Sequence, residues 1–360
     1  MLLVFALAAA LWGVGALMGV PRARRMVLIA VLLAAVILAQ LVLPPGNALR
    51  AATGGSAAPW LMLAGAGVLV WLYAQVLGRL RGRAVTREAE AAPTPRPGAF
   101  TETELDRYAR HIVLRELGGP GQKRLKNARV LVIGAGGLGS PALLYLAASG
   151  VGTIGVIDDD VVENANLQRQ VIHRDADIGI PKVLSAQAAM EAQNPGVTVR
   201  PYHRRLDEEI AGALLEDYDL VLDGTDNFAT RYLANRVAVA WGKPLISGAL
   251  SQWEGQLSVF DPAHGAPCYQ CIFPEAPAPG LAPSCAEAGV VGPLPGVIGA
   301  MMAVEAVKVI TWAGAPLRGE MLIYDALYGE TRKIGLKPRG DCPVCGGGVA
   351  QAADGGVTAG

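Results

Sequence analysis

The 360-residue sequence has no excess of charge of either sign, because 31 Lys and Arg residues balance 31 Asp and Glu residues. This balance argues against a dedicated nucleic-acid-binding protein, which needs a surplus of basic residues. Acidic residues are missing altogether from residues 1–80. The only charged side chains in that stretch are five arginines: Arg22, Arg24, Arg25, Arg50 and Arg79. Hydrophobic residues make up 52% of the chain, too many for a disordered protein. We therefore expect a folded domain in water and a second part, within residues 1–80, whose surroundings are not water.

Three long apolar runs, at residues 1–20, 26–43 and 60–77, fill most of the acid-free stretch. Each run is close to the ~20 residues that a helix needs to cross a ~30 Å hydrocarbon core, so we expect three transmembrane helices within residues 1–80. A cleaved signal peptide is the alternative for the first run, but its basic cluster follows the apolar stretch and does not precede it. No charged side chain inside the runs marks a transport path, which favours a simple membrane anchor.

The arginines that flank the runs predict how the chain is oriented in the membrane. They gather between the first two runs and directly after the third: Arg22, Arg24, Arg25, Arg79, Arg81 and Arg83. The loop at residues 44–59 has only Arg50. Because basic loops stay on the cytoplasmic side, we expect a multi-pass protein of the cytoplasmic (inner) membrane. Its amino terminus would lie outside, and everything after Arg79 would lie in the cytoplasm.

A linker and one large domain follow the apolar runs. Three alternating prolines, at positions 93, 95 and 97, predict that residues 81–100 form an extended linker. The domain is expected at residues 101–346 and begins with a polar helix at 102–117. We expect the glycine-rich residues 347–360 to form a disordered tail.

A glycine-rich turn follows the first predicted strand of this domain. The strand at Arg129–Ile133 leads into a turn with four glycines, and a helix at 140–148 follows; the glycines are Gly134, Gly136, Gly137 and Gly139. Glycines let the backbone approach a phosphate, and the amino terminus of the helix adds N–H donors. A second strand at Thr153–Ile157 leads to Asp158, whose carboxylate can hold the hydroxyl groups of a ribose. The pattern predicts a nucleotide site and leaves the nucleotide open.

Further strands alternate with helices along the domain. We expect strands at 197–202, 220–222, 244–247 and 257–260, with helices at 207–215 and 227–241. This alternation predicts an α/β fold with a doubly wound, mostly parallel, Rossmann-like sheet. Ligands of such a sheet bind at the carboxyl ends of the strands.

Charged and amide side chains cluster in three motifs near those strand ends: Asn166-Leu-Gln-Arg169-Gln170, Pro181-Lys182 and Asp223-Gly-Thr-Asp226-Asn227. Arg169 and Lys182 can neutralise the charge that builds up during phosphoryl or nucleotidyl transfer, and Asp226 can hold Mg²⁺. Taken singly, Arg169 or Lys182 is equally well explained as a solvated surface charge, and Asp226 as a helix N-cap. Together they favour ATP chemistry over hydride transfer.

Four of the five cysteines form two Cys-x-x-Cys pairs: Cys268 with Cys271, and Cys342 with Cys345. Two such pairs supply the four thiolates of a tetrahedral structural Zn²⁺ site. A redox function is the alternative, but redox pairs stand at helix starts, and three glycines follow Cys345. We therefore expect a zinc clamp that ties the end of the domain to the segment around Cys268, away from the nucleotide phosphates.

The ordered motifs resemble the family of MoeB, ThiF and HesA, bacterial relatives of the ubiquitin-activating enzymes, and are closest in pattern to its molybdopterin-synthase adenylyltransferases. The resemblance covers residues 102–345. It is carried by the glycine turn, the three charged motifs, the two cysteine pairs and three further motifs: Arg107-Tyr-Ala-Arg110-His111, Glu254-Gly-Gln256 and Pro283-Ser-Cys285-Ala-Glu-Ala-Gly289.

The resemblance implies adenylation of a ubiquitin-like sulfur-carrier protein (MoaD- or ThiS-type) at its C-terminal Gly-Gly, giving an acyl-adenylate and pyrophosphate. It implies that Gly137 lies against the nucleotide and that Asp158 holds the ribose. By the same resemblance Asn166, Arg169 and Lys182 contact phosphates and ribose, and Asp226 with Asn227 completes the Mg²⁺–ATP site. Arg110 would reach into the partner subunit's site, which implies a homodimer. Ala165 stands where relatives often have a serine, so one hydroxyl contact to phosphate is missing.

Cys285 matches the position where some relatives have a sulfur-handling or thioester-forming cysteine, so it is a candidate catalytic residue. Adenylation needs no nucleophilic side chain, and an idle thiol explains Cys285 equally well. No rhodanese-like segment follows Cys345, so we expect a separate protein to donate sulfur. Whether the carrier serves molybdenum cofactor biosynthesis, thiamine biosynthesis or another pathway stays open.

Two other functions compete with adenylation. An NAD-dependent oxidoreductase accounts for the glycine turn and Asp158. It does not account for four other residues taken together: Arg110, Arg169, Lys182 and Asp226. A non-catalytic membrane scaffold with the same fold is the second alternative. The intact set of charged residues argues against it.

Overall fold

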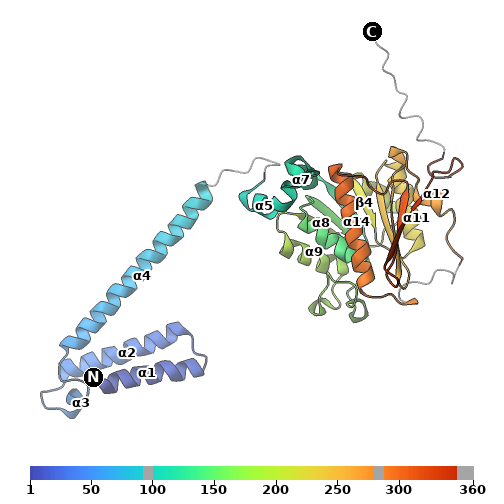
Figure 1. The fold of residues 1–360 in the computed structure, drawn as a ribbon. Helices are drawn as coiled ribbons and strands as arrows, with labels where there is room; N and C mark the ends of the chain where they lie inside the picture. Colours follow the sequence, from blue (N-terminus) through green and yellow to red (C-terminus); the bar gives the residue numbers. More distant parts are fainter. Residues whose placement is uncertain (92–99, 279–287, 347–360) are drawn as a thin grey trace, which may run out of the picture. The chain divides into compact units, whose positions relative to one another are not determined.

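The computed structural model describes residues 1–91, 100–278 and 288–346, and the chain divides into two units (Figure 1). The N-terminal unit comprises Met1–Thr94, and the α/β unit comprises Pro95–Gly360. The predicted tail at 347–360 and Cys285 lie outside the described residues.

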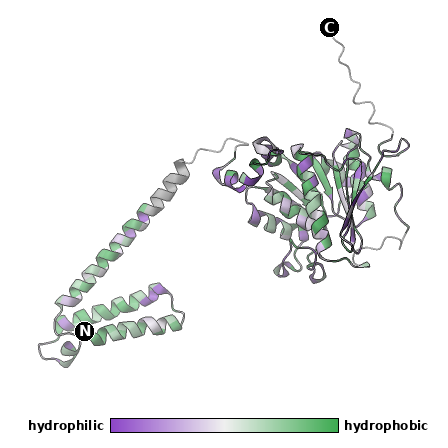
Figure 2. Cartoon of the chain, in the orientation of Figure 1, coloured by the Kyte–Doolittle hydropathy of each residue, from purple (hydrophilic) through white to green (hydrophobic). Residues whose placement is uncertain are grey.

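The described part of the N-terminal unit is helical: α1 (Leu2–Leu17), α2 (Arg22–Val42), α3 (Ala48–Ala52) and α4 (Ala58–Ala91). Helix α2 packs against both α1 and α4. Most large apolar side chains of these helices are exposed, and Figure 2 shows the helices as largely hydrophobic. By length and composition, α2 and the Ala58–Leu80 part of α4 could each cross a membrane, whereas α1 has only 16 residues.

Helix α4 is longer than the sequence predicts, because it runs through the first part of the expected linker to Ala91. Alanine, arginine and glutamate dominate positions 79–91, and all three favour a helix. Pro93 cannot continue a helix without losing a hydrogen bond. The rest of the predicted linker, at 92–99, lies outside the described residues.

A small polar cluster joins α2, α3 and α4 at one end of the N-terminal unit. The Gln40 side chain, which is only 2% exposed, donates from Nε2 to the Arg50 carbonyl (2.9 Å) and to Thr53 Oγ1 (2.7 Å). Trp60 Nε1 donates to the Thr53 carbonyl at 3.0 Å. The Arg50 guanidinium donates to the Leu43 carbonyl at the end of α2 (2.7 Å). These bonds satisfy backbone groups where the chain turns back.

One sheet organises the α/β unit, in the order β3-β2-β1-β4-β5-β6-β7-β8. The strands are β1 (Arg129–Ile133), β2 (Thr153–Ile157), β3 (Thr198–Tyr202), β4 (Leu220–Asp223), β5 (Leu245–Leu250), β6 (Glu254–Phe260), β7 (Glu320–Asp325) and β8 (Glu330–Gly335). Strands β1 to β5 are parallel, whereas β6, β7 and β8 pair antiparallel to their neighbours. The sheet is therefore mixed: five of its eight strands are parallel, as expected, and the antiparallel strands β6, β7 and β8 extend it beyond β5.

Short connections explain this change of direction. Only three residues, Ser251, Gln252 and Trp253, join β5 to β6, and four residues join β7 to β8. A parallel pairing needs a crossover of about a dozen residues or more, so both connections can only form hairpins. Strand β8 is exposed along its whole length, which is why its sequence shows no buried-strand pattern.

Helices cover both faces of the sheet and bury two separate cores (Figure 1). Helices α7 (Gly118–Asn127), α8 (Gly139–Ala148), α9 (Lys182–Gln193) and α14 (Pro293–Thr311) cover one face. Helices α10 (Glu208–Glu216), α11 (Phe228–Ala240) and α12 (Tyr269–Ile272) cover the other. Helix α14 is also apolar and long enough to span a membrane, but more than half of it is buried against the sheet, so it is a core helix.

The polar helix expected at 102–117 consists of two short helices, α5 (Glu102–Arg107) and α6 (Ala109–Ile112), followed by a turn. A capping box between Thr101 and Glu104 starts α5. The chain breaks at Tyr108, which is 3% exposed and receives a hydrogen bond from Asn194 Nδ2 (2.8 Å). The buried Tyr108 side chain therefore stands where the two short helices meet.

Candidate nucleotide site

The glycine turn and the loop after β4 lie side by side at the carboxyl edge of the sheet. Strands β1 and β4 are neighbours, and the strand order reverses between them, which is where such sheets bind ligands. The Gly224 N–H donates to the Ile133 carbonyl at the end of β1 (3.0 Å). A Cβ on Gly134, whose φ is +92°, would lie 3.3 Å from Thr225 Cγ2. The two loops are therefore in contact.

A side chain is excluded at one further position of the turn and would be tightly packed at another. A Cβ on Gly139 would overlap the carbonyl oxygen of Gly134, because α8 starts directly under the turn. A Cβ on Gly137 would lie 3.0 Å from Pro295 in the first turn of α14. The turn, with Gly136 at its centre, therefore exposes backbone in front of the amino terminus of α8, an arrangement suited to an anion.

Asp158 connects β2 to the glycine turn. Its Oδ2 accepts a hydrogen bond from the Ala135 N–H and its Oδ1 from the Asp160 N–H, both at 2.8 Å. Lys182 is 4% exposed and donates from Nζ to Asp160 Oδ2 at 2.7 Å. Lys182 is therefore a buried, ion-paired cation at the start of α9 and not a solvated surface charge.

Arg169 also lies against the turn. Its guanidinium donates to the Ala165 carbonyl (3.2 Å) and to Asn166 Oδ1 (3.3 Å), which folds the motif into a compact turn. Its Cγ would lie 3.7 Å from a Cβ on Gly137. The structure thus brings Arg169, Lys182 and Asp158 to one edge of the sheet.

Asp226 is exposed, and its carboxylate has no hydrogen-bond or ion-pair partner among the residues that the structure describes. Asn227, and not Asp226, is the N-cap of α11, because its Oδ1 accepts from the Thr230 N–H at 3.1 Å. The alternative interpretation of Asp226 as a cap is therefore wrong. Arg110 is exposed on α6, and no contact within residues 100–278 or 288–346 ties it to the glycine turn.

A buried histidine, His173, contacts the backbone of the glycine turn. His173 Nε2 lies 2.9 Å from the Ala135 carbonyl, and Nδ1 lies 2.9 Å from Ser185 Oγ, which in turn donates to Asp177 Oδ2 (2.7 Å). Burial lowers the pKa of His173, and the nearby charge of Lys182 acts in the same direction. No local pattern in the sequence marks His173, because its contact with Ala135 joins residues 38 positions apart.

A buried ion pair that the sequence analysis also missed lies behind the Asp226 loop. Asp223 is fully buried, and Arg231 on α11 is 5% exposed. Arg231 Nη1 lies 3.5 Å from Asp223 Oδ2 and donates to Ser247 Oγ on β5 (2.9 Å). An arginine on a helix is usually solvated, so the sequence offers no signal for this pair.

The four paired cysteines form a separate cluster. Their four Sγ atoms, those of Cys268, Cys271, Cys342 and Cys345, all lie within 4.8 Å of one another. The Arg339 backbone N–H donates to Cys271 Sγ at 3.4 Å, a bond that commonly supports metal thiolates. Burial raises the pKa of Cys268 to about 11, so a metal would have to displace its proton.

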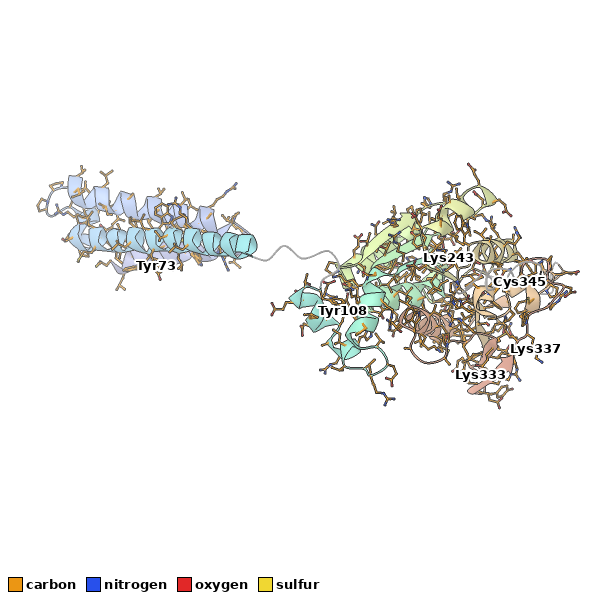
Figure 3. The ribbon with its side chains drawn as sticks, turned by 90° about the horizontal axis from the view of Figure 1, so that it is seen from above. Tyr73, Tyr108, Lys243, Lys333, Lys337 and Cys345 are labelled. Atoms are coloured by element: carbon orange, nitrogen blue, oxygen red, sulfur yellow. The ribbon has the colours of Figure 1, made fainter. Side chains whose placement is uncertain are left out.

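The cysteine cluster lies away from the glycine turn. It follows β6 and β8, which both run antiparallel to β5 and therefore end at the opposite edge of the sheet. In Figure 3, Cys345 and Tyr108 lie toward opposite ends of the α/β unit. The donor set and its spacing fit Zn²⁺.

Comparison with known proteins places this unit among relatives with named activities. The model of the ThiF family matches residues 108–344. The "Sulfur carrier protein adenylyltransferase" of Thermus thermophilus is 52% identical over 251 residues, which cover 69% of this chain and 93% of that protein. The "SAMP-activating enzyme E1" of Haloferax volcanii is 49% identical over 253 residues, with 70% and 93% covered. The "Probable adenylyltransferase/sulfurtransferase MoeZ" of Mycobacterium tuberculosis is 52% identical, but this chain covers only 62% of it.

Solved structures share the fold at lower identity. The crystal structure of E. coli MccB with AMPCPP and MccA matches with a TM-score of 0.60 at 23% identity, over 69% of this chain and 75% of that one. PaaA matches with a TM-score of 0.57 at 23% identity, over 77% and 90%. These two likenesses concern the fold alone.

Proposed function

Because the chain belongs to the ThiF family, we propose that it is an ATP-dependent adenylyltransferase acting on a ubiquitin-like sulfur-carrier protein. The observation that carries the proposal is the convergence of Arg169, Lys182 and Asp158 on the glycine turn, at the point where the strand order reverses. The names of relatives about 50% identical supply the class of substrate.

The proposed reaction joins two negatively charged groups. An oxygen of the carrier's C-terminal glycine carboxylate attacks the α-phosphorus of ATP, the bond from that phosphorus to the bridging oxygen breaks, and pyrophosphate leaves. Arg169 and Lys182 would offset the charge that keeps a carboxylate and a triphosphate apart. The amino terminus of α8 would add N–H donors to the phosphates, and Asp158 would hold the ribose. A Gly-Gly tail suits the site because it brings no side chain into it.

Asp226 is the residue that would hold Mg²⁺. Its carboxylate is exposed beside the glycine turn and lacks a partner among the described side chains, which leaves its oxygens available to a hard cation. Bound Mg²⁺ supplies positive charge that bridges phosphate oxygens. Asn227 would contribute by fixing the start of α11, directly after Asp226.

We further propose a homodimer in which Arg110 reaches the partner subunit's site. Arg110 is exposed and has no partner within the described part of its own chain. The packed helices α8, α9 and α14 also expose large apolar side chains, with Tyr145 and Val304 each 57% exposed. Mixing Arg110→Ala with Asp226→Ala protomers tests this, because a mixed dimer contains one intact site. About a quarter of wild-type activity should return, and none will return if each chain works alone.

The N-terminal unit would anchor the enzyme in the cytoplasmic membrane, with the amino terminus outside and the α/β unit in the cytoplasm. Its exposed apolar helices support insertion into a membrane. The two arginine clusters support the orientation. A separate protein would then donate sulfur to the activated carrier, in molybdenum cofactor, thiamine or related biosynthesis. Labelling of single cysteines introduced at residues 2 and 55 in intact cells tests the topology, and labelling of both from the cytoplasm would exclude it.

Exchange of labelled pyrophosphate into ATP tests the activity. The purified full-length protein should catalyse exchange with an intact carrier and not with one that lacks its final glycine. Arg169→Ala should lower the rate by about 100- to 1000-fold. Arg236→Ala is the matched control, because Arg236 pairs with Glu208 on the outer side of α11. No exchange with any carrier would refute the proposal, and binding of NAD without ATP would favour an oxidoreductase.

A further inference from the structure

Asp223 and Arg231 form a buried ion pair directly behind the candidate Mg²⁺–ATP site. The two side chains are 1% and 6% exposed. Removing two charges from water is costly, and an apolar pair of the same size would often stabilise a protein as well. Stability alone therefore does not account for this pair, and its contacts indicate what else it does.

The contacts of the pair converge on one residue, Thr225. Asp223 Oδ1 accepts hydrogen bonds from the Thr225 N–H (3.1 Å) and from its hydroxyl (2.7 Å). Arg231 Nη2 donates to the Thr225 carbonyl. The backbone on both sides of the Thr225 Cα is thus held by charged, buried partners.

The same guanidinium ties Thr225 to the neighbouring strand. Arg231 donates to Ser247 Oγ (2.9 Å) and to the Gly248 carbonyl (2.7 Å), both on β5. Ser247 Oγ also lies 3.3 Å from Asp223 Oδ2. These bonds leave two separate nitrogens, Nη1 and Nη2, that the planar guanidinium holds at a fixed spacing, whereas an ammonium has a single nitrogen.

Thr225 is followed directly by Asp226, whose own side chain has no partner among the described residues. Nothing on the Asp226 side chain can therefore fix where its carboxylate points. Its position depends on the backbone on either side, which Thr225 and the N-cap Asn227 hold.

We propose that Arg231, with Asp223, is a positioning residue that fixes the Asp226 carboxylate for Mg²⁺–ATP. The inference rests on the proposed function in one respect, namely that Asp226 holds Mg²⁺ with ATP. The network acts through Thr225 and touches neither nucleotide nor carrier. Its loss should weaken binding of the metal complex of ATP and leave metal-free ATP binding unchanged.

Calorimetric titration of the full-length protein with ATP, once with Mg²⁺ and once with EDTA, tests this. Arg231→Lys keeps the charge and loses the fork, and it should weaken binding of Mg²⁺–ATP by about tenfold, as loss of residues that orient metal ligands does. Binding in EDTA should change by less than about twofold by the same reasoning. Arg236→Lys, on the exposed side of the same helix, should alter neither.

A second variant covers the case in which Arg231→Lys fails to fold. Thr225→Val removes only the hydroxyl bond to Asp223, and it should weaken Mg²⁺–ATP binding in the same direction by a smaller factor. Equal loss with Mg²⁺ and with EDTA, or no loss in either variant, overturns the inference. A wild-type protein that binds Mg²⁺–ATP but catalyses no exchange refutes the proposed function and leaves this inference standing. One that binds no Mg²⁺–ATP refutes both.

Discussion

The N-terminal unit and the α/β unit place apolar and polar side chains in opposite ways. In the N-terminal unit, Leu69, Val70 and Trp71 are between 60% and 69% exposed, whereas the polar Gln40 is 2% exposed. In the α/β unit, residues such as Leu131 and Leu222 are fully buried between sheet and helices. Apolar exposure of the first kind is unfavourable in water and favourable in lipid, so the comparison supports two different solvents.

The two units also differ in their content of side chains that bind metals or change charge near neutral pH. Residues 1–80 contain no cysteine, no histidine and no acid, so every metal-ligating or pH-sensitive side chain discussed above belongs to the α/β unit. Agents that act on thiols or on protons should therefore affect one unit and spare the other. That contrast can be tested on the full-length protein in detergent.

Loss of one cysteine from the four-cysteine cluster should produce the largest effect. Cys271→Ser takes one thiolate from the cluster, and because ligand binding free energy adds to folding free energy, the α/β unit should melt about 10 °C lower or more. Near-ultraviolet circular dichroism follows the melting, and elemental analysis counts bound zinc per chain.

The remaining cysteine supplies the control. Cys285→Ser removes the one thiol outside the two pairs and should leave both zinc content and melting unchanged. The helical signal of the N-terminal unit should persist in either variant. Retention of zinc and of the wild-type melting temperature in Cys271→Ser would exclude a structural metal at this cluster.

A smaller effect should follow from titration of His173. Its pKa in the folded unit is lowered, chiefly by burial, so the unfolded chain binds this proton more tightly. Stability linked to His173 is therefore present above about pH 6.5 and is lost as the pH falls through the lower folded value. Between pH 7 and pH 5 the melting temperature of the α/β unit should drop by about 3 °C on this account.

Two substitutions isolate this contribution. His173→Gln keeps polar atoms near Ala135 and Ser185 but does not titrate, so part of the pH dependence should disappear. His203→Gln removes an exposed histidine and should leave the profile unchanged. Identical profiles for wild type and His173→Gln would show that the buried ring does not titrate in this range.

Much of the fold could be predicted from the sequence where signals are local. Strands β1 and β2 have the predicted bounds, because short β-branched runs stand directly before a glycine turn and before Asp158. Strands β7 and β8 were missed. Strand β8 is exposed throughout and mixes charged with apolar residues, so it lacks the alternation that marks a half-buried strand.

The residues of the candidate site also fall into those that local sequence patterns predict and those that they do not. Arg169 and Lys182 stand in short motifs after strand ends, so chain direction alone placed them near the glycine turn. The partners of Arg231 lie 16 and 17 residues further along, on β5, and become neighbours only through the pairing of β4 with β5. Such contacts depend on strand order, which local patterns do not contain.

Removal of residues 1–91 should have the smallest effect on catalysis and the clearest effect on location. Every residue assigned to the site has a number of 110 or higher, and 251 residues of this chain match 93% of the length of the Thermus thermophilus relative. The shortened protein should therefore catalyse exchange within about twofold of the wild-type rate, because the transition state gains nothing from the lost helices. It should also move from the membrane pellet to the soluble fraction, since the exposed apolar helices are gone. If the shortened protein stays in the membrane pellet, the α/β unit must have a membrane-binding surface of its own. A large loss of exchange would mean that the N-terminal unit contributes to the reaction. It would refute the assignment of catalysis to the α/β unit alone.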